Sequence, residues 1–198
     1  MQSKNGTHKL FVTLGATSHS AGDRANDDYY ATDPRVVEEL LKYEKFSNNI
    51  WEPACGEGHI SKALERNGYN VLSTDLVDRG FGRGGCDFLA QTQQFDGDII
   101  TNPPYKYALE FVRQALNLVP AGHKVAMLLR LQFLEGKSRR QLFDSQPPTT
   151  VYVSSSRISC CKNGDFRPGQ TGYSSAQAYA WFIWTKGFSG DPVIKWFN

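Results

Sequence analysis

Long apolar runs, metal-binding motifs and strong net charge are all missing from this sequence of 198 residues. No stretch approaches the roughly 20 apolar residues that cross a bilayer, which argues against a membrane protein. The polar start, Met1 to Thr7, lacks the apolar stretch of a signal peptide, so we expect a cytoplasmic protein. Because 40% of the residues are hydrophobic, the chain can form a folded core, and disorder over most of its length is excluded.

Cysteine and histidine are also scarce, with four of each. The cysteines, at positions 55, 86, 160 and 161, include no C-x-x-C pair of the kind that suits zinc or redox sites. The histidines are scattered along the chain. We therefore expect no metal ion, and we interpret the cysteines as buried free thiols in a reducing compartment.

The formal net charge is only +2, but the charge is unevenly distributed. Residues 1–120 carry 12 basic and 16 acidic groups, whereas residues 121–198 carry 10 basic and 4 acidic groups. This surplus could face a polyanion, although a mixed solvated surface gives the same count. The basic residues concerned are Arg130, Lys137, Arg139, Arg140, Arg157, Lys162 and Arg167.

Residues 1–28 are polar and rich in Gly, Ser and Asn, so we expect a flexible N-terminal arm before a single domain, residues 29–198. Asp33 followed by Pro34 is typical of a helix start and predicts a helix over 34–45. Further along, the pattern predicts strands at 49–52, 69–74, 98–101 and 124–131, with helices at 60–67 and 107–118. This alternation indicates an α/β fold with a mostly parallel sheet and helices on both faces.

Beyond residue 150 the rhythm changes. Residues 150–154 and 178–186 resemble strands, and the loop 155–175 lies between them. An antiparallel hairpin at one sheet edge fits this pattern.

The segment Trp51 to Gly58 (WEPACGEG) joins a predicted strand to a predicted helix. Gly56 and Gly58 allow a tight turn close to a ligand, and the helix N-terminus offers N–H groups. A dinucleotide loop would need a third glycine where Ser61 stands, and no Walker lysine follows. Glu52, directly before the turn, disfavours a pyrophosphate and favours a cationic part of a ligand.

Two acidic residues follow the next strand. Asp75 ends the segment Leu72 to Asp75 and could accept both hydroxyl hydrogens of a ribose, although a turn cap would also explain it. Asp87 could pair with an adenine amino group, and Phe88 could cover the adenine ring. Together these residues indicate a nucleoside site.

The sharpest motif is Asn102-Pro103-Pro104-Tyr105, at the end of a buried strand. Two prolines remove two N–H donors, which leaves acceptors. The Asn102 side-chain oxygen and the Pro103 carbonyl could hold one amino group, while Tyr105 offers a ring for a planar substrate. An amino group conjugated to a ring fits this arrangement.

Glu52 to Gly58 followed by Asn102 to Tyr105 resembles the S-adenosylmethionine-dependent amino-methyltransferases, specifically the DNA adenine type of bacteria and phages. Tyr29 to Pro34 resembles the segment before the cofactor loop, and Ala180 to Trp184 resembles a late strand of the phage-type enzymes. The resemblance covers roughly residues 28–186. It implies a class I Rossmann-like fold with a seven-stranded sheet and a reversed C-terminal hairpin.

The resemblance also implies roles for individual residues. Catalysis would rest on positioning of the amine by Asn102, Pro103, Pro104 and Tyr105. The residues implied to bind S-adenosylmethionine are Tyr30, Thr32, Glu52, Pro53, Ala54, Gly56, Gly58, His59, Ile60, Asp75, Leu76, Asp87, Phe88 and Asn102. The residues implied to bind a flipped base and its phosphates are Tyr105, Lys106, Arg157, Lys162 and Arg167.

The chain departs from sequence-specific members of this family, because it has no room for a separate target-recognition domain after the catalytic sheet. We therefore expect action on short sites, on single strands or as an oligomer, with a monomer or weak homodimer as the resting form. DNA is the expected partner and RNA the nearest alternative, since both offer the same amine. A protein glutamine methyltransferase and a catalytically silent nucleic-acid-binding module are two further alternatives.

Overall fold

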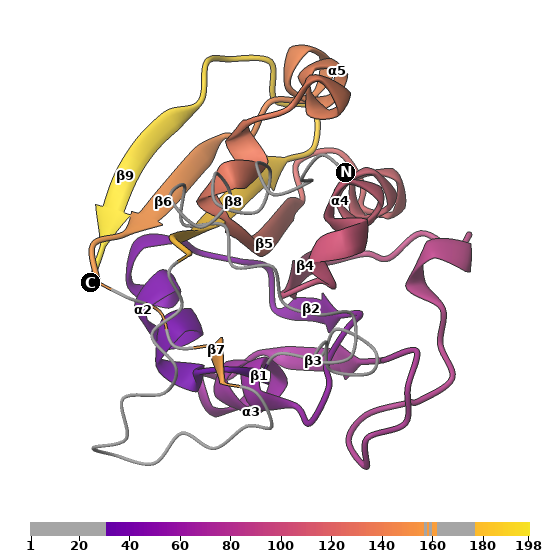
Figure 1. Cartoon of the computed structure of the whole chain (residues 1–198). Coiled ribbons are helices and arrows are strands. Elements are labelled where there is room, and N and C mark those ends of the chain that lie inside the picture. Colours follow the sequence, from indigo (N-terminus) through magenta and orange to yellow (C-terminus); the bar gives the residue numbers. More distant parts are fainter. Residues whose placement is uncertain (1–30, 157, 159, 162–176) are drawn as a thin grey trace, which may run out of the picture.

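A seven-stranded sheet forms the centre of the computed structural model, which describes residues 31–156, 158, 160–161 and 177–198. Only β8 runs antiparallel to its neighbours, and every other neighbouring pair is parallel. This arrangement confirms the predicted fold class and the reversed C-terminal hairpin. In spatial order (Figure 1) the strands are β3 (Asn70–Ser73), β2 (Asn49–Glu52), β4 (Asp98–Thr101), β5 (Lys124–Arg130), β8 (Tyr179–Thr185), β6 (Thr150–Ser154) and β9 (Val193–Phe197).

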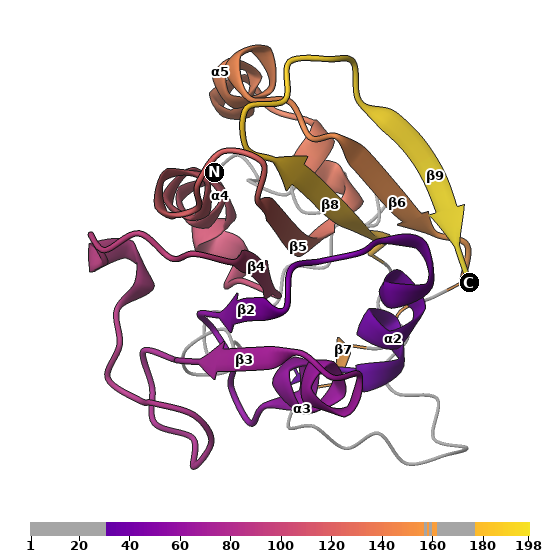
Figure 2. The same cartoon turned by 180° about the vertical axis from the view of Figure 1, so that it is seen from behind.

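Helices cover both faces of the sheet. On one face α2 (Pro34–Tyr43) and α3 (His59–Arg66) pack against strand residues such as Ile100 and Leu128. On the other face α4 (Ala108–Leu118) and α5 (Lys137–Ser145) pack against residues such as Ile99 and Met127. Figures 1 and 2 show the two layers from opposite sides.

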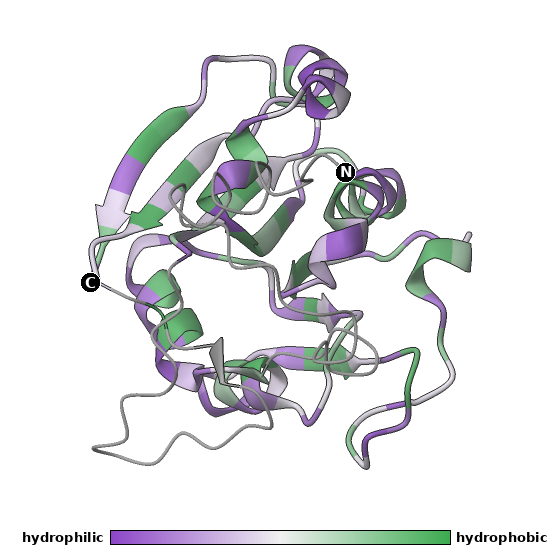
Figure 3. Cartoon of the chain, viewed as in Figure 1, coloured by the Kyte–Doolittle hydropathy of each residue, from purple (hydrophilic) through white to green (hydrophobic). Residues whose placement is uncertain are grey.

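Successive residues of the central strands contribute to opposite cores, because side chains alternate between the faces of a sheet. The central strands are therefore largely apolar, whereas the helices carry both polar and apolar residues (Figure 3). None of the helices in the described part of the chain is long and apolar enough to cross a bilayer.

The predicted elements before residue 131 are confirmed, with bounds that differ by one or two residues. Helix α2 begins as expected, since the Asp33 side chain accepts a hydrogen bond from the Arg35 amide and Pro34 occupies the first turn. Elements that the sequence analysis missed are α5, β9 and a small antiparallel pair, β1 (Ala31–Thr32) with β7 (Cys160–Cys161). Strand β7 lies inside the stretch that was predicted to be a loop.

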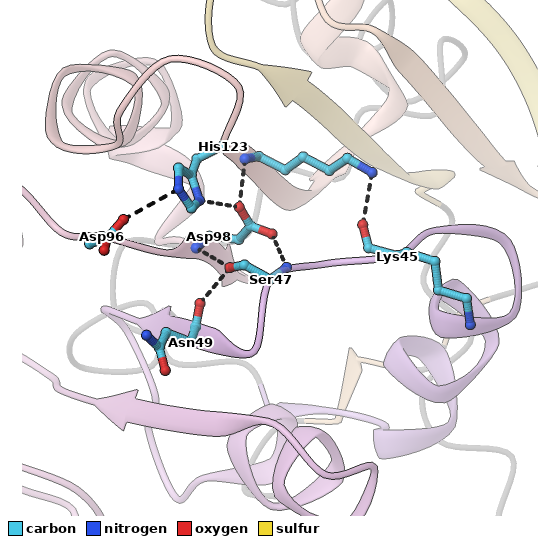
Figure 4. A network of polar contacts seen from close by, with 7 residues as sticks. Lys45, Ser47, Asn49, Asp96, Asp98 and His123 are labelled. Carbon is cyan, nitrogen blue, oxygen red and sulfur yellow. Dashed lines mark hydrogen bonds and ion pairs between the residues drawn. The ribbon is translucent and has the colours of Figure 1, made fainter.

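A buried carboxylate ties the amino ends of the central strands together (Figure 4). Asp98, at the start of β4, is only 3% exposed. Its side chain accepts hydrogen bonds from the Ser47 amide at 2.6 Å and the Lys124 amide at 2.8 Å, and its Oδ1 lies 3.0 Å from His123 Nδ1. In return, the Ser47 hydroxyl accepts the Asp98 amide at 3.1 Å. One side chain thereby joins the starts of β4 and β5 to the segment before β2.

Replacing Asp98 should destabilise the fold. We expect Asp98→Ala to lower the free energy of unfolding by about 3 kcal/mol, because two partly buried backbone N–H groups lose the side chain that accepts their hydrogen bonds. Urea denaturation followed by circular dichroism measures this loss. The matched control is Asp96→Ala, since Asp96 also contacts His123, at 3.5 Å, but its side chain is 96% exposed. A control loss as large as that of Asp98→Ala would contradict the role given to burial.

Candidate functional site

A cavity of about 770 Å³ lies at the edge of the sheet where β2, β3 and β4 end. The chain leaves β2 toward β3 on one side, and β4 lies on the other side, so the cavity sits at a topological switch point. Most of the residues predicted from the sequence line it. They are Thr32, Glu52, Pro53, Ala54, His59, Ile60, Asp75, Leu76, Asp87, Phe88, Asn102, Pro103, Pro104, Tyr105 and Lys106.

The remaining predicted residues are placed differently. Gly56 and Gly58 are not part of the cavity wall. Tyr30, Arg157, Lys162 and Arg167 lie outside the described residues. The wall also includes residues that the sequence analysis missed: Ala31, Cys55, Val77, Arg79, Cys86, Leu89, Tyr107 and Phe111. Most of them are immediate neighbours of motif residues, and that adjacency is the signal that could have found them.

Glu52, the last residue of β2, is a buried carboxyl group at the base of the cavity. Its Oε2 accepts a hydrogen bond from the Ser61 amide at 2.8 Å and another from the Ser61 hydroxyl. Burial raises the pKa of Glu52 to about 8, although the hydrogen bonds from Ser61 act in the opposite direction. The Glu52 side chain therefore accepts hydrogen bonds from the first turn of α3, and its carboxyl group would lose its proton when a positive charge binds nearby.

Asp75 follows β3 and holds the loop after β2 in place. Its Oδ2 accepts the Gly56 amide at 2.8 Å, and its Oδ1 accepts the Val77 amide at 2.9 Å. The two oxygens are thereby fixed in orientation, and each carboxylate oxygen can accept more than one hydrogen bond. Gly56, at φ +55°, contributes its backbone N–H to this arrangement.

Gly58 is required for packing. It has φ +79°, and a Cβ atom there would lie 2.3 Å from the Phe81 ring. Phe81 belongs to the loop between Asp75 and Asp87, and its carbonyl oxygen also lies 3.6 Å from the Cys55 sulfur. The loop between Asp75 and Asp87, here called the outer loop, therefore packs against the turn after β2. The close approach at Gly58 in this structure is to Phe81, and its predicted contact with a ligand stays a prediction.

Asp87 and Phe88 have separate roles in the structure. Asp87 caps the short 3-10 helix η2 (Phe88–Ala90), since its Oδ1 accepts the Leu89 amide at 2.9 Å. The ring of Phe88 is 2% exposed and packs against Trp51 and Phe111, with centroid distances of 5.2 and 4.9 Å. The Phe88 ring therefore belongs mainly to the core and forms the inner wall. The exposed apolar side chains at this end of the cavity are Leu76 and Leu89.

Asn102 follows β4 at the opposite end of the cavity wall. Its Nδ2 donates a hydrogen bond to the Thr32 hydroxyl at 2.9 Å, and Thr32 is buried. This bond sets the orientation of the amide and makes Oδ1 its accepting end. Pro103 and Pro104 come next, without N–H donors, so the turn offers carbonyl oxygens.

Tyr105 begins the 3-10 helix η3 (Tyr105–Tyr107) and has aromatic and cationic neighbours. The guanidinium of Arg130 lies over its ring at 4.7 Å from the centroid. The ring of Tyr179 lies 5.8 Å away, tilted by 42°. Lys106 and Tyr107 continue the wall, with the ammonium of Lys106 5.0 Å from the Tyr107 ring centroid.

The titratable groups of the wall suit binding better than nucleophilic attack. Burial raises the pKa of Cys55 to about 12, so its thiol is protonated at neutral pH. Burial also lowers the pKa of His59, against the opposing effect of Glu57, so its imidazole is neutral at pH 7. Within the described ranges, no three His, Cys, Asp or Glu side chains lie close enough to hold a metal ion.

Sequence comparison finds no relative: neither a protein-family model nor a curated protein matches the chain. Structural comparison does find similar folds. A Listeria monocytogenes protein assigned to the class I S-adenosylmethionine-dependent methyltransferases has a TM-score of 0.61 and 13% identity, over 95% of this chain and 71% of that chain. A Pyrococcus horikoshii protein assigned as an RNA methyltransferase has a TM-score of 0.56 and 12% identity, over 92% and 99%.

The M protein of the type I restriction enzyme EcoKI is a third similar structure, with a TM-score of 0.56 and 15% identity. The match covers 83% of this chain but only 45% of that one. Identities this low show a shared fold. With its strand order, its reversed strand β8 and its cavity at the carboxyl ends of the strands, the chain has the fold of the class I S-adenosylmethionine-dependent methyltransferases.

Proposed function

We propose that this chain transfers a methyl group from S-adenosylmethionine to the exocyclic 6-amino group of adenine in DNA. One observation carries the proposal. The Asn102 to Tyr105 turn lines the same cavity as three carboxyl-bearing residues, Glu52, Asp75 and Asp87, so acceptors for an amine lie beside groups suited to a nucleoside.

The cofactor half of the cavity fits the chemistry of S-adenosylmethionine. The buried carboxyl of Glu52 suits the positively charged methionine end, and Asp75 suits the ribose hydroxyls. Asp87 would accept the adenine amino group, while Leu76 and Leu89 would cover the adenine ring. When bound, the cofactor supplies a methyl group on a positively charged sulfur. The protein has to hold that group in line with the incoming amine.

The substrate half of the cavity would hold the amine. The Asn102 oxygen and the Pro103 carbonyl would accept its two hydrogens, which directs the nitrogen lone pair toward the methyl group. Thr32 keeps the Asn102 amide in the required orientation. A base would stack against the Tyr105 ring, which lines the cavity. No covalent intermediate with the protein is needed, in keeping with the protonated thiol of Cys55.

RNA adenine is a second candidate substrate. The Pyrococcus horikoshii protein that matches almost over its full length is assigned as an RNA methyltransferase, whereas the EcoKI M protein is classed as an adenine-specific DNA methyltransferase. The motif resemblance favours DNA. The cavity itself serves either substrate, because both present the same amino group.

The decisive experiment is transfer of a radiolabelled methyl group to unmethylated duplex DNA, single-stranded DNA, RNA and a protein extract in parallel. We expect the label in DNA, as 6-methyladenine after nucleoside analysis. Label in RNA would move the proposal to the second candidate. Label in protein only, or no transfer despite cofactor binding, would overturn it.

Asn102→Ala should separate catalysis from cofactor binding. We expect the rate of methyl transfer to fall by about 100-fold or more, because one acceptor for the amine is lost, while the Kd for S-adenosylmethionine changes less than about threefold. Single-turnover kinetics and calorimetry measure the two quantities. Asn117→Ala, an exposed position on α4, is the matched control. Parallel losses of rate and cofactor affinity would point to a structural role for Asn102 instead.

Cofactor binding should depend on pH through Glu52. Because the pKa of Glu52 is about 8 in the free protein, pairing with a cation at lower pH requires release of one proton. We expect the affinity for S-adenosylmethionine to rise by close to tenfold per pH unit from pH 6 to 7.5. Glu52→Gln should bind more weakly and without this slope. Calorimetry in two buffers of different ionisation enthalpy measures both affinity and proton release, and equal wild-type affinities at pH 6 and 7.5 would contradict the role of Glu52.

A further inference from the structure

Arg130 is a basic residue beside the cavity that the proposed chemistry does not use. Strand β5 extends beyond its last pairing with β4, which joins Thr101 to Met127, and ends at Arg130. If the parallel register continues, Leu128 lies alongside Asn102, and Arg130 follows two residues, roughly 7 Å, further on. The end of β5 therefore lies beyond the level of Asn102 along the strand direction.

The guanidinium of Arg130 is held by an aromatic ring. It lies over Tyr105 at 4.7 Å from the ring centroid. In the sheet, Arg130 is paired with Tyr179, whose ring also contacts the Tyr105 ring. A planar guanidinium keeps its N–H groups available when it stacks on a ring, because the stacking uses its face. The contact thus fixes the position of the charge without neutralising it.

Within the part of the chain that the structure describes, the guanidinium of Arg130 forms no ion pair with a carboxylate. Its Nε atom is shielded from solvent and has no hydrogen-bond partner among the described residues. By contrast, Arg35, Arg66 and Arg140 each lie within 3.0 Å of a carboxylate oxygen. Arg139 also has a shielded Nε, but its Nη2 donates to backbone carbonyls within its own segment. Arg130 is therefore suited to an anion that arrives with the substrate.

We propose that Arg130 binds a backbone phosphate next to the target adenine, which makes the substrate a nucleic acid rather than a protein side chain. This inference rests on the proposed function of the same cavity. In a nucleotide the phosphate lies a ribose away from the base, so a base bound against Tyr105 in the cavity would bring its phosphate near the guanidinium of Arg130, which contacts the same ring. Arginine matches a phosphate with two parallel N–H donors. Tyr105 and Arg130 would thus recognise the base and the phosphate of one nucleotide.

A neutral backbone analogue tests this inference directly. The probes are short single-stranded DNA oligonucleotides with one adenine, in which the two phosphates flanking the adenine are either ordinary phosphodiesters or uncharged methylphosphonates. Fluorescence anisotropy at fixed salt measures binding in the presence of S-adenosylhomocysteine. We expect the wild-type protein to bind the methylphosphonate oligonucleotide about tenfold more weakly. RNA oligonucleotides of the same sequence, with the same two linkages, form a second arm that distinguishes the source of the phosphate.

Arg130→Gln should bind the charged oligonucleotide about tenfold more weakly and lose nothing further with the methylphosphonate, because the two changes remove the same contact. Arg130→Lys, which keeps the charge but not the planar stack, should fall between wild type and Arg130→Gln. Arg113→Gln, an exposed position on α4 outside the cavity wall, removes the same charge and should change binding less than twofold. An unchanged Kd for S-adenosylmethionine in each variant verifies that the fold is intact.

The outcomes separate this inference from the proposed function. Equal losses for Arg130→Gln on both oligonucleotides, no loss on either, or a wild-type protein that binds neither of them would overturn the phosphate contact. Methyl transfer to adenine that is unaffected by Arg130→Gln would leave the proposed function standing and remove the inference. Binding that depends on Arg130 and on the phosphate charge, without formation of 6-methyladenine, would support the phosphate contact and contradict the proposed function.

Discussion

The hydrogen bond from the Gly56 amide to the Asp75 carboxylate joins the ends of two neighbouring strands, and the cavity is built around it. The backbone supports this bond on both sides, because the Thr74 amide donates to Glu52 and the Cys55 amide donates to Thr74. The distance between the carboxyl groups of Glu52 and Asp75 is thereby set by the sheet. Glu52 and Asp75 each accept hydrogen bonds from the protein, and these bonds fix the orientation of their carboxyl groups before a ligand binds.

The amino ends and the carboxyl ends of the central strands have different roles. At the amino ends of the strands, the buried Asp98 side chain satisfies backbone N–H groups and joins segments that are far apart in the sequence. At the carboxyl ends, the polar groups of Glu52 and Asn102 line a cavity. Because β2, β3 and β4 each span four residues, the side chains at their amino ends differ from those that line the cavity at their carboxyl ends. This division is typical of sheets whose ligands bind beyond the carboxyl ends of parallel strands.

The sequence was most informative where local signals and chemistry coincide. The Asp33-Pro34 pair defined the start of α2, and the buried strand before Asn102 placed the sharpest motif at a strand end. Helix α5 was not predicted because Leu142 is its only buried residue, and β9 was not predicted because it is an edge strand with most side chains exposed. The packing of the Phe88 ring on Trp51 and Phe111 was not predicted, because no local sequence pattern reveals it. Contacts across the sheet, such as Arg130 on Tyr105, likewise depend on register.

The packing of Phe81 on Gly58 has a consequence for the motions of the cavity. With a ring seated where a Cβ would be, the outer loop and the turn after β2 cannot separate without exposing that ring to water. The ammonium of Lys62 lies 4.7 Å from the same ring centroid and adds a third element, helix α3, to the contact. Opening of this side of the cavity would therefore be a cooperative event, in which the loop leaves as a unit instead of fraying residue by residue.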